Sequence, residues 1–186
     1  MSTSRIRARA GAAIVSGLLL AGGLAAPRVH AQRAGASTTN RESVSRIQRI
    51  EDTAEIQTLL LNYGRHLDAR DFKAYAQLFA KDGVWIGGMG TVRGPAAIQA
   101  FMEKAIPGPN TSHNYHLLSN FVIDVAGDTA TAWSRWQFVV PGADGKPAIA
   151  QAGRYDDTLV REDGRWRFKQ RVASNDIPAA GPVRTK

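Results

Sequence analysis

The sequence predicts an α+β protein whose helices come before an antiparallel sheet. In the segment 45–105, apolar side chains recur mainly at steps of three and four, the spacing of amphipathic helices. After Asn110 the period changes to two, the spacing of half-buried strands. Helical segments followed by a strand meander favour one domain in which the helices cover one face of the sheet.

Residues 1–31 have the pattern of a secretory signal rather than of folded structure. Three arginines and no acid precede the apolar run GAAIVSGLLLAGGLAA, and Val29 and Ala31 are small residues at the −3 and −1 positions of a cleavage site. The run is short and glycine-rich for a membrane span, which takes about 20 apolar residues. We therefore expect a periplasmic or secreted protein without a stable membrane span after cleavage; an uncleaved anchor or a disordered tail is the alternative.

The remaining chain is predicted to consist of a flexible leader at 32–44, a folded domain at 45–173 and a loose tail at 174–186. The four arginines of residues 1–31 supply half of the formal net charge of +8, so only +4 remains outside that segment. This charge forms no basic stripe of the kind that binds nucleic acid. Because the chain has no cysteine, disulfides, thiolate metal sites and cysteine nucleophiles are excluded.

Three helices are predicted in the first half of the domain. The first runs from Ser45 to Leu67, where apolar residues form a continuous stripe. The second covers RDFKAYAQLFAKDG, residues 70–83, and Gly83 breaks it. Pro95 opens the third, PAAIQAFMEKA, because proline suits the first turn of a helix.

Two groups of strands are predicted, short ones between the second and third helices and longer ones after the third helix. Short strands with a glycine-rich bend are expected in VWIGGMGTVRG, between the second and third helices. Longer strands joined by hairpin turns are expected in the alternating segments NYHLLSNFVIDVA, TATAWSRWQFVV, AIAQAGRYDDTLVRE and RWRFKQRVA.

These segments, in this order and spacing, resemble the SnoaL-like branch of the nuclear transport factor 2-like superfamily. The likeness is carried by IQTLLLNYGRHLDARDFKAYAQLFAKDGVW, GPAAI, HLLSNFVIDVAGDTATAWS and GRYDDTLVREDGRWRFKQR, and it covers residues 46–172. It implies a cystatin-like roll, in which a cone-shaped, curved antiparallel or mixed sheet and three N-terminal helices enclose a pocket. It also implies a homodimer or homotrimer. Because the superfamily includes enzymes, ligand binders and interaction modules, fold alone leaves the activity open.

The resemblance also implies catalytic residues. Similar members include bile acid 7α-dehydratase, scytalone dehydratase and lindane dehydrochlorinase, which eliminate a small molecule without a cofactor. Their aspartate and histidine correspond to Asp68 and His116 here, and the tyrosine of the dehydratases to Tyr63. A carboxylate fixes the histidine tautomer, so its other nitrogen can remove a proton next to a carbonyl, while a tyrosine hydroxyl stabilises the enolate. No metal site is predicted, since His113 and His116 have no third ligand near them in sequence.

Each of these three residues also has a purely structural explanation. Tyr63 lies on the apolar stripe of its helix, Asp68 stands where a turn or capping residue is common, and His116 fits a core histidine in an alternating strand. Catalysis and structure therefore remain alternatives for all three.

Four further side chains are predicted to bind substrate: Trp85, Trp133, Arg135 and Tyr155. Alternation places Trp133 and Arg135 on one face of their strand and Trp136 on the other, and the sequence leaves open which face lines the pocket. Arg135 could bind a carboxylate or polarise a substrate oxygen, but a surface position explains it better. Asp156 and Asp157 are expected at a solvated strand edge.

The functional hypothesis is an exported, cofactor-independent lyase that acts on a small apolar carbonyl or hydroxylated molecule and breaks a carbon–oxygen or carbon–halide bond. The alternative is a non-catalytic module for small-molecule binding or assembly on the same cone. An isomerase or epoxide hydrolase gains less support, because the acids such enzymes carry on their strands have no counterpart here.

Overall fold

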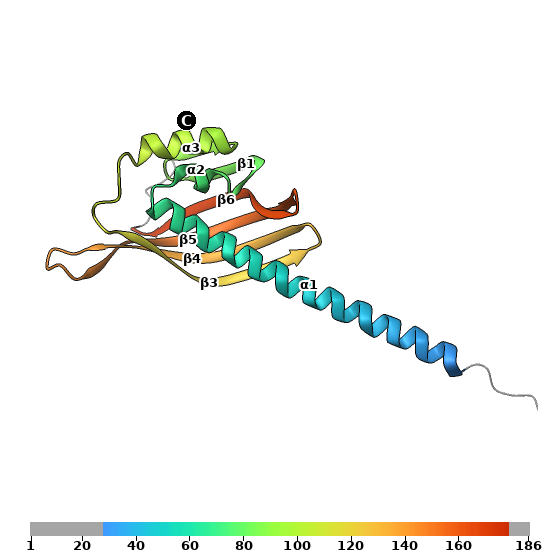
Figure 1. Ribbon diagram of the computed structural model, residues 1–186. Helices are drawn as coiled ribbons and strands as arrows, with labels where there is room; N and C mark the ends of the chain where they lie inside the picture. Colours follow the sequence, from blue (N-terminus) through green and yellow to red (C-terminus); the bar gives the residue numbers. More distant parts are fainter. Residues whose placement is uncertain (1–27, 179–186) are drawn as a thin grey trace, which may run out of the picture. The chain divides into compact units, whose positions relative to one another are not determined.

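The computed structural model describes residues 28–178 (Figure 1). Residues 1–27 of the expected signal segment (1–31) and residues 179–186 of the expected tail (174–186) lie outside the described residues, and residues 28–31 are helical. Contacts divide the chain into a unit ending at Arg41 and a unit from Glu42 onward, and the fold and site below belong to the second.

The first helix, α1 (Arg28–Asp68), begins well before the predicted Ser45. Residues 32–44, predicted as a flexible leader, are therefore helical. The prediction relied on apolar periodicity, which detects only helices that bury one face, and this stretch is polar. No helix in the described part of the chain is long and apolar enough to cross a membrane.

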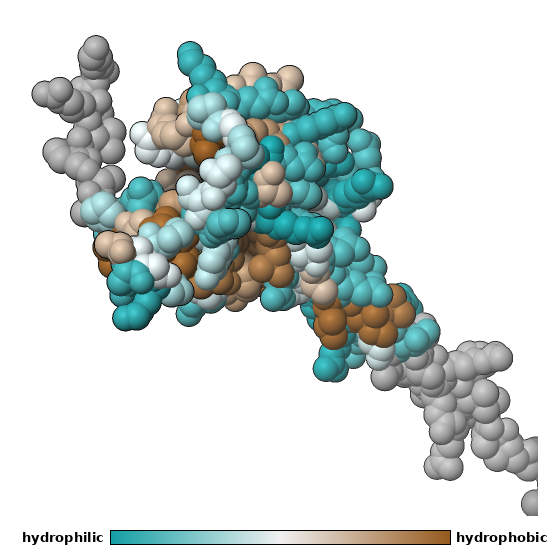
Figure 2. Space-filling model, turned by 60° about the vertical axis from the view of Figure 1, so that its left-hand side comes forward, coloured by the Kyte–Doolittle hydropathy of each residue, from teal (hydrophilic) through white to brown (hydrophobic). Residues whose placement is uncertain are grey.

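The second half of α1 buries its apolar stripe. Ile56, Leu60 and Tyr63 are almost fully buried, at steps of four and three residues that place them on one face. Nearer the N-terminus the stripe continues without cover: Val44 and Ile47 are exposed, and apolar surface is visible along this part of the helix (Figure 2).

The second helix is much shorter than predicted. α2 (Phe72–Ala76) starts at its N-cap Asp71, whose carboxylate accepts a hydrogen bond from the Ala74 amide, and the chain then continues as strand β1 (Phe79–Gly87). Phe79 pairs with Phe168 in the sheet, and this long-range pairing overrides the local helical pattern. Gly83 therefore lies inside a strand. A Cβ there would stand 2.7 Å from the Phe168 carbonyl oxygen, so the close approach requires glycine.

The remaining predicted elements are confirmed. They are β2 (Gly90–Arg93), α3 (Pro95–Ala105), β3 (Tyr115–Ala126), β4 (Thr129–Pro141), β5 (Pro147–Glu162) and β6 (Arg165–Ile177). The sheet order is β2-β1-β6-β5-β4-β3, and every pair is antiparallel except β1–β6. Because β6 continues to Ile177, the first residues of the predicted tail belong to the sheet.

The sheet is curved and the helices cover its inner face (Figure 1). Register shifts interrupt the pairing in β3, β4 and β5, and such bulges bend strands. At Gly153 a Cβ would stand 1.9 Å from the Ser174 carbonyl oxygen and 2.7 Å from the Trp136 ring. Glycine thus allows β5 to approach its neighbours closely at the bend, where the inner face widens into a cavity.

Candidate active site

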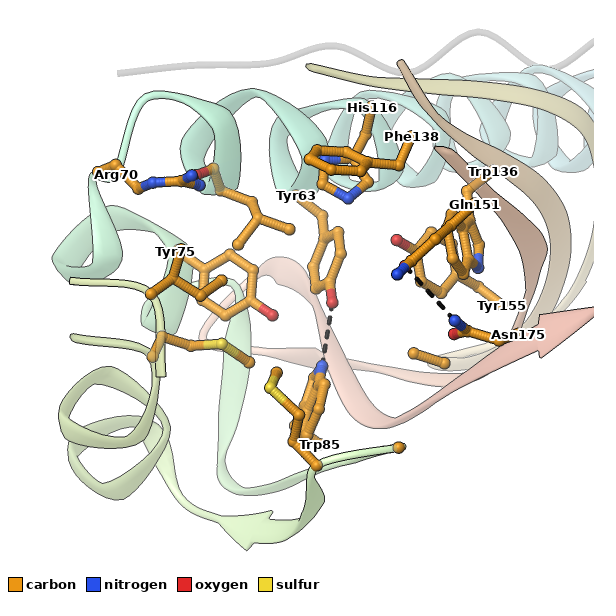
Figure 3. Close-up of a pocket in the computed structure, with 16 residues that line it drawn as sticks. Tyr63, Arg70, Tyr75, Trp85, His116, Trp136, Phe138, Gln151, Tyr155 and Asn175 are labelled. Carbon is orange, nitrogen blue, oxygen red and sulfur yellow. Dashed lines mark hydrogen bonds between the residues drawn. The ribbon is translucent and has the colours of Figure 1, made fainter. Parts of the chain in front are cut away.

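A cavity of about 350 Å³ lies between α1, α3 and the inner face of the sheet (Figure 3). Its wall is largely aromatic, with contributions from Tyr63, Tyr75, Trp85, Trp136, Phe138 and Tyr155. Such a concave, mostly apolar space with a few polar groups is typical of small-molecule sites.

The wall brings Asp68 and His116 together from positions 48 residues apart. Asp68 Oδ1 lies 2.6 Å from His116 Nδ1, and Oδ2 accepts the His116 backbone N–H at 2.8 Å. An ionised carboxylate only accepts hydrogen bonds, so Nδ1 carries a proton, and in the neutral ring Nε2 keeps the lone pair. Figure 3 shows His116 pointing into the cavity. The arrangement provides a base with a fixed tautomer.

Asp68 lies in the last turn of α1, where a carboxylate needs compensating interactions. The chain leaves the helix in a Schellman motif: Asp71 N–H bonds the His66 carbonyl at 2.9 Å, and Arg70 N–H bonds the Leu67 carbonyl at 3.1 Å. A carboxylate in the last helical turn faces the negative end of the helix dipole, which is unfavourable. The two hydrogen bonds from His116 offset this repulsion for Asp68.

Asn110 ties the loop before β3 to the same helix end. Its Nδ2 donates to the Asp68 carbonyl at 3.1 Å and to the Asn114 carbonyl at 2.7 Å. The backbones on both sides of the Asp68–His116 pair are therefore joined by hydrogen bonds, which restricts relative movement of the two side chains.

Tyr63 has its hydroxyl oriented by Trp85. The indole Nε1, which is only a donor, lies 3.0 Å from the Tyr63 hydroxyl oxygen. The oxygen accepts this bond, so the Tyr63 proton is free to donate to another acceptor. Both side chains are buried and line the cavity (Figure 3).

A buried ion pair between Arg171 and Asp157 packs against the ring of Tyr63. Arg171 donates from Nε and Nη2 to the Asp157 carboxylate at 2.8 and 2.7 Å, and neither side chain is exposed. The guanidinium carbon lies 3.9 Å from the centre of the Tyr63 ring and 4.1 Å from that of Tyr155. Burial alone would lower the pKa of Arg171, but the Asp157 carboxylate outweighs it and raises that pKa, so the guanidinium stays charged.

Asp157 therefore corrects the prediction of a solvated strand edge. Alternation along β5 turns Asp157 inward while its neighbour Asp156 stays exposed. The hairpin places Asp157 directly opposite Arg171, and the opposite charges of these cross-strand partners are a signal that the sequence did contain.

Tyr75, which the sequence analysis named only as part of the second predicted helix, lines the cavity. Its side chain is fully buried, and its hydroxyl has no hydrogen-bond partner among the described residues. Burial, followed by the proximity of Tyr63, raises the pKa of Tyr75 well above its ordinary value, so the hydroxyl keeps its proton. The cavity thus contains a second unused donor near Tyr63 (Figure 3).

Two of the four predicted substrate-binding residues line the cavity, and two do not. Trp85 and Tyr155 line the cavity, whereas Trp133 and Arg135 do not. Strand alternation is the reason: Trp136 faces inward on β4, so Trp133 and Arg135 project from the other face. There Arg135 forms an ion pair with Asp176 and stacks 5.1 Å from the Trp133 ring centre.

Within residues 28–178 no three side chains of the metal-ligating types gather into a metal site. The polar side chains that a ligand in the cavity can contact include His116, the three tyrosine hydroxyls, and Arg70, Gln151 and Asn175 of the lining.

Comparison with known proteins assigns the family. The family model described as a SnoaL-like domain matches residues 48–172. This chain belongs to the SnoaL-like family. The SnoaL-like domain is 30% identical over 135 residues to the protein Rv2910c of Mycobacterium tuberculosis, covering 70% of this chain and 89% of that protein.

Solved structures confirm the fold expected for a SnoaL-like domain. An NTF2-like protein with a cystatin-like fold from Novosphingobium aromaticivorans superposes with a TM-score of 0.65 at 27% identity, covering 74% of this chain and 90% of that one. LinA superposes with a TM-score of 0.61 at 23% identity, covering 71% and 90%. The curved sheet with its helices is thus the nuclear transport factor 2-like architecture.

Proposed function

We propose that this SnoaL-like domain is a cofactor-independent lyase that eliminates water or halide from a small, mostly apolar carbonyl-bearing or hydroxylated molecule. The observation that carries the proposal is the Asp68–His116 contact at the wall of an aromatic cavity. A tautomer-fixed imidazole beside apolar space is suited to removing a proton from carbon.

The elimination starts when His116 Nε2 takes a proton from the carbon next to the substrate carbonyl. The electron pair of the broken C–H bond forms an enolate, whose collapse makes a C=C bond and expels the leaving group from the neighbouring carbon. A departing hydroxide takes the proton from His116 and leaves as water; a departing halide leaves as the ion, and the proton passes to solvent. Asp68 stabilises the imidazolium that exists between these steps.

The two tyrosines have a matching role at the substrate oxygen. Tyr63 accepts its hydrogen bond from Trp85, so its proton is available for the enolate oxygen. Tyr75 offers an unpartnered hydroxyl beside it. Donors already oriented before the reaction stabilise a developing oxyanion without reorganisation, which is a large contribution in many enzymes.

Deuterium exchange tests the base without knowledge of the natural leaving group. We expect the protein to accelerate loss of the α-proton NMR signals of 2-tetralone in D₂O, and His116→Ala to reduce this acceleration by about a hundredfold or more. His66→Ala is the matched control, because His66 lies on the same helix end and outside the cavity lining. Exchange that is equally fast in His116→Ala contradicts the proposal.

A binding module is the second candidate, and one contact favours it. Asp68 also bonds the His116 backbone N–H, which is a structural role that needs no chemistry. In that case apolar ligands bind with unchanged affinity in His116→Ala, and no variant affects turnover because there is none.

We also propose that the protein is exported and forms homodimers or homotrimers. Export is supported by the signal pattern of residues 1–31. Association is supported by Tyr115 and Leu117, which flank His116 on β3 and are exposed on the opposite face. Cell fractionation and light scattering test the two statements, and a cytoplasmic, monomeric protein contradicts them.

A further inference from the structure

Arg70 is a charged side chain in the cavity wall that the proposed elimination does not use. Among the residues that line the cavity, it is the one whose charge persists at every working pH. The rest of the lining consists of His116, neutral polar groups and apolar or aromatic side chains. Arg70 is half-buried, so water solvates its guanidinium unless an internal partner or a ligand replaces that water.

No internal anion is present for Arg70. Across residues 28–178, no acidic side chain lies within ion-pair distance of its guanidinium. Its Nη1 donates to the Leu67 carbonyl at 2.9 Å, and its Nε is buried without a hydrogen-bond partner. The bond to Leu67 fixes one side of the guanidinium, whereas Nη2 is not buried and has no hydrogen-bond partner among the described residues.

Helix capping explains only part of this arrangement. A cation near the last carbonyls of α1 is favourable, which accounts for the Nη1 bond. The backbone position, however, suits another residue type: Arg70 has φ of 59°, at the site of the Schellman motif where glycine is usual. Capping accounts for the Nη1 bond, but it does not account for a left-handed arginine in the cavity wall whose Nη2 stays open.

We infer that Arg70 binds a carboxylate on the ligand, so the substrate is an apolar molecule that also carries an anionic group. The open Nη2 of the guanidinium can donate a charge-assisted hydrogen bond to a carboxylate oxygen. Arg70 follows Asp68 by two residues, so the bound carboxylate lies at the same end of the cavity as His116. This assignment deepens the proposed function by naming its substrate class, and the binding step is separable from the reaction.

Calorimetry with a matched pair of ligands tests this inference. The probes are 2-naphthoate and its neutral analogue 2-acetylnaphthalene. We expect the wild-type protein to bind 2-naphthoate about tenfold tighter, since a charged hydrogen bond discriminates by at least this factor. Arg70→Asn, which keeps a residue that tolerates the left-handed conformation, should abolish the preference and leave 2-acetylnaphthalene affinity unchanged. Arg65→Asn is the control, because Arg65 is exposed on the same last turn of α1.

The outcomes separate this inference from the lyase proposal. The preference for 2-naphthoate should survive His116→Ala, which has no turnover, so it does not depend on catalysis. Equal affinities in the wild-type protein, or a preference that persists in Arg70→Asn, overturn the inference. Loss of the preference in His116→Ala assigns the anion to the imidazole and overturns it too. Loss of both ligands in Arg70→Asn means that Arg70 only maintains the cavity, which also overturns it.

Discussion

Asp68 and His116 meet through both oxygens of one carboxylate. Oδ1 contacts the ring Nδ1 at 2.6 Å, and Oδ2 accepts the backbone N–H of the same residue at 2.8 Å. One bond orients the imidazole and the other fixes the strand that carries it. The sequence alone left structure and chemistry as alternatives for Asp68. Under the proposed function they are compatible, because the same carboxylate makes both bonds.

Tyr63→Phe should destabilise the protein although it keeps the ring. The substitution leaves the buried Trp85 indole N–H without its acceptor, and such a donor costs about 1–3 kcal/mol. Urea unfolding measures the loss. Tyr115→Phe is the control, because the Tyr115 side chain is exposed and its change should be close to zero. Equal stabilities for Tyr63→Phe and wild type contradict the hydrogen bond.

Removing one partner of the Asp157–Arg171 pair should lower the free energy of unfolding much more than removing both partners. Arg171→Met or Asp157→Leu alone leaves a buried, unpaired charge, for which the expected loss is about 3–5 kcal/mol. The double variant restores neutrality and should recover part of this loss in urea unfolding. The partly exposed Arg135–Asp176 pair is the comparison, with an expected effect of about 0–1 kcal/mol. Additive single effects contradict the assigned coupling.

Alkaline pH should weaken the fold through Tyr75. Burial, and then the proximity of Tyr63, raises the folded-state pKa of Tyr75 above the unfolded value of about 10. The contribution of Tyr75 to stability is therefore complete below about pH 10 and is lost as the pH rises toward the folded pKa. Chemical unfolding at pH 8 to 11 should show a smaller decline in Tyr75→Phe. An identical decline in both proteins shows that Tyr75 is not the source.

Arg70→Gly should stabilise the protein. Arg70 occupies a left-handed backbone conformation, which costs a non-glycine residue about 1 kcal/mol. Thermal unfolding should therefore show a gain of about that size, together with weaker carboxylate binding. Ala69→Gly one residue earlier is the control: Ala69 has no positive φ, so glycine should lower stability there. A loss in both variants contradicts the strain at Arg70.

Much of the fold was predictable because it depends on local patterns. Neighbouring residues determine three of these features: the period of two in β3 to β6, the turns between these strands, and the start of α3 at Pro95. The length of the second helix was not, because Phe79 joins a strand through its pairing with Phe168. Local propensity cannot anticipate a partner so distant in sequence.

The site was predictable only in part, for a similar reason. Asp68 and His116 lie 48 residues apart, and only the family resemblance linked them. Alternation on β4 defined two faces but not which one turns inward, so the sequence could not tell whether Trp133 and Arg135 line the cavity. Tyr75 was overlooked because an aromatic residue on an apolar face normally indicates packing, and its free hydroxyl is visible only in three dimensions.

The tautomer of His116 tests the central claim most directly. Nitrogen-15 NMR of the histidine side chains distinguishes a ring nitrogen that carries a proton from one with a lone pair. In the neutral form we expect Nδ1 to be protonated and Nε2 to be free, and Asp68→Asn to disturb this assignment. An Nε2-protonated ring that is indifferent to Asp68→Asn contradicts the account, since the free nitrogen of His116 is then Nδ1, which faces Asp68 and not the substrate.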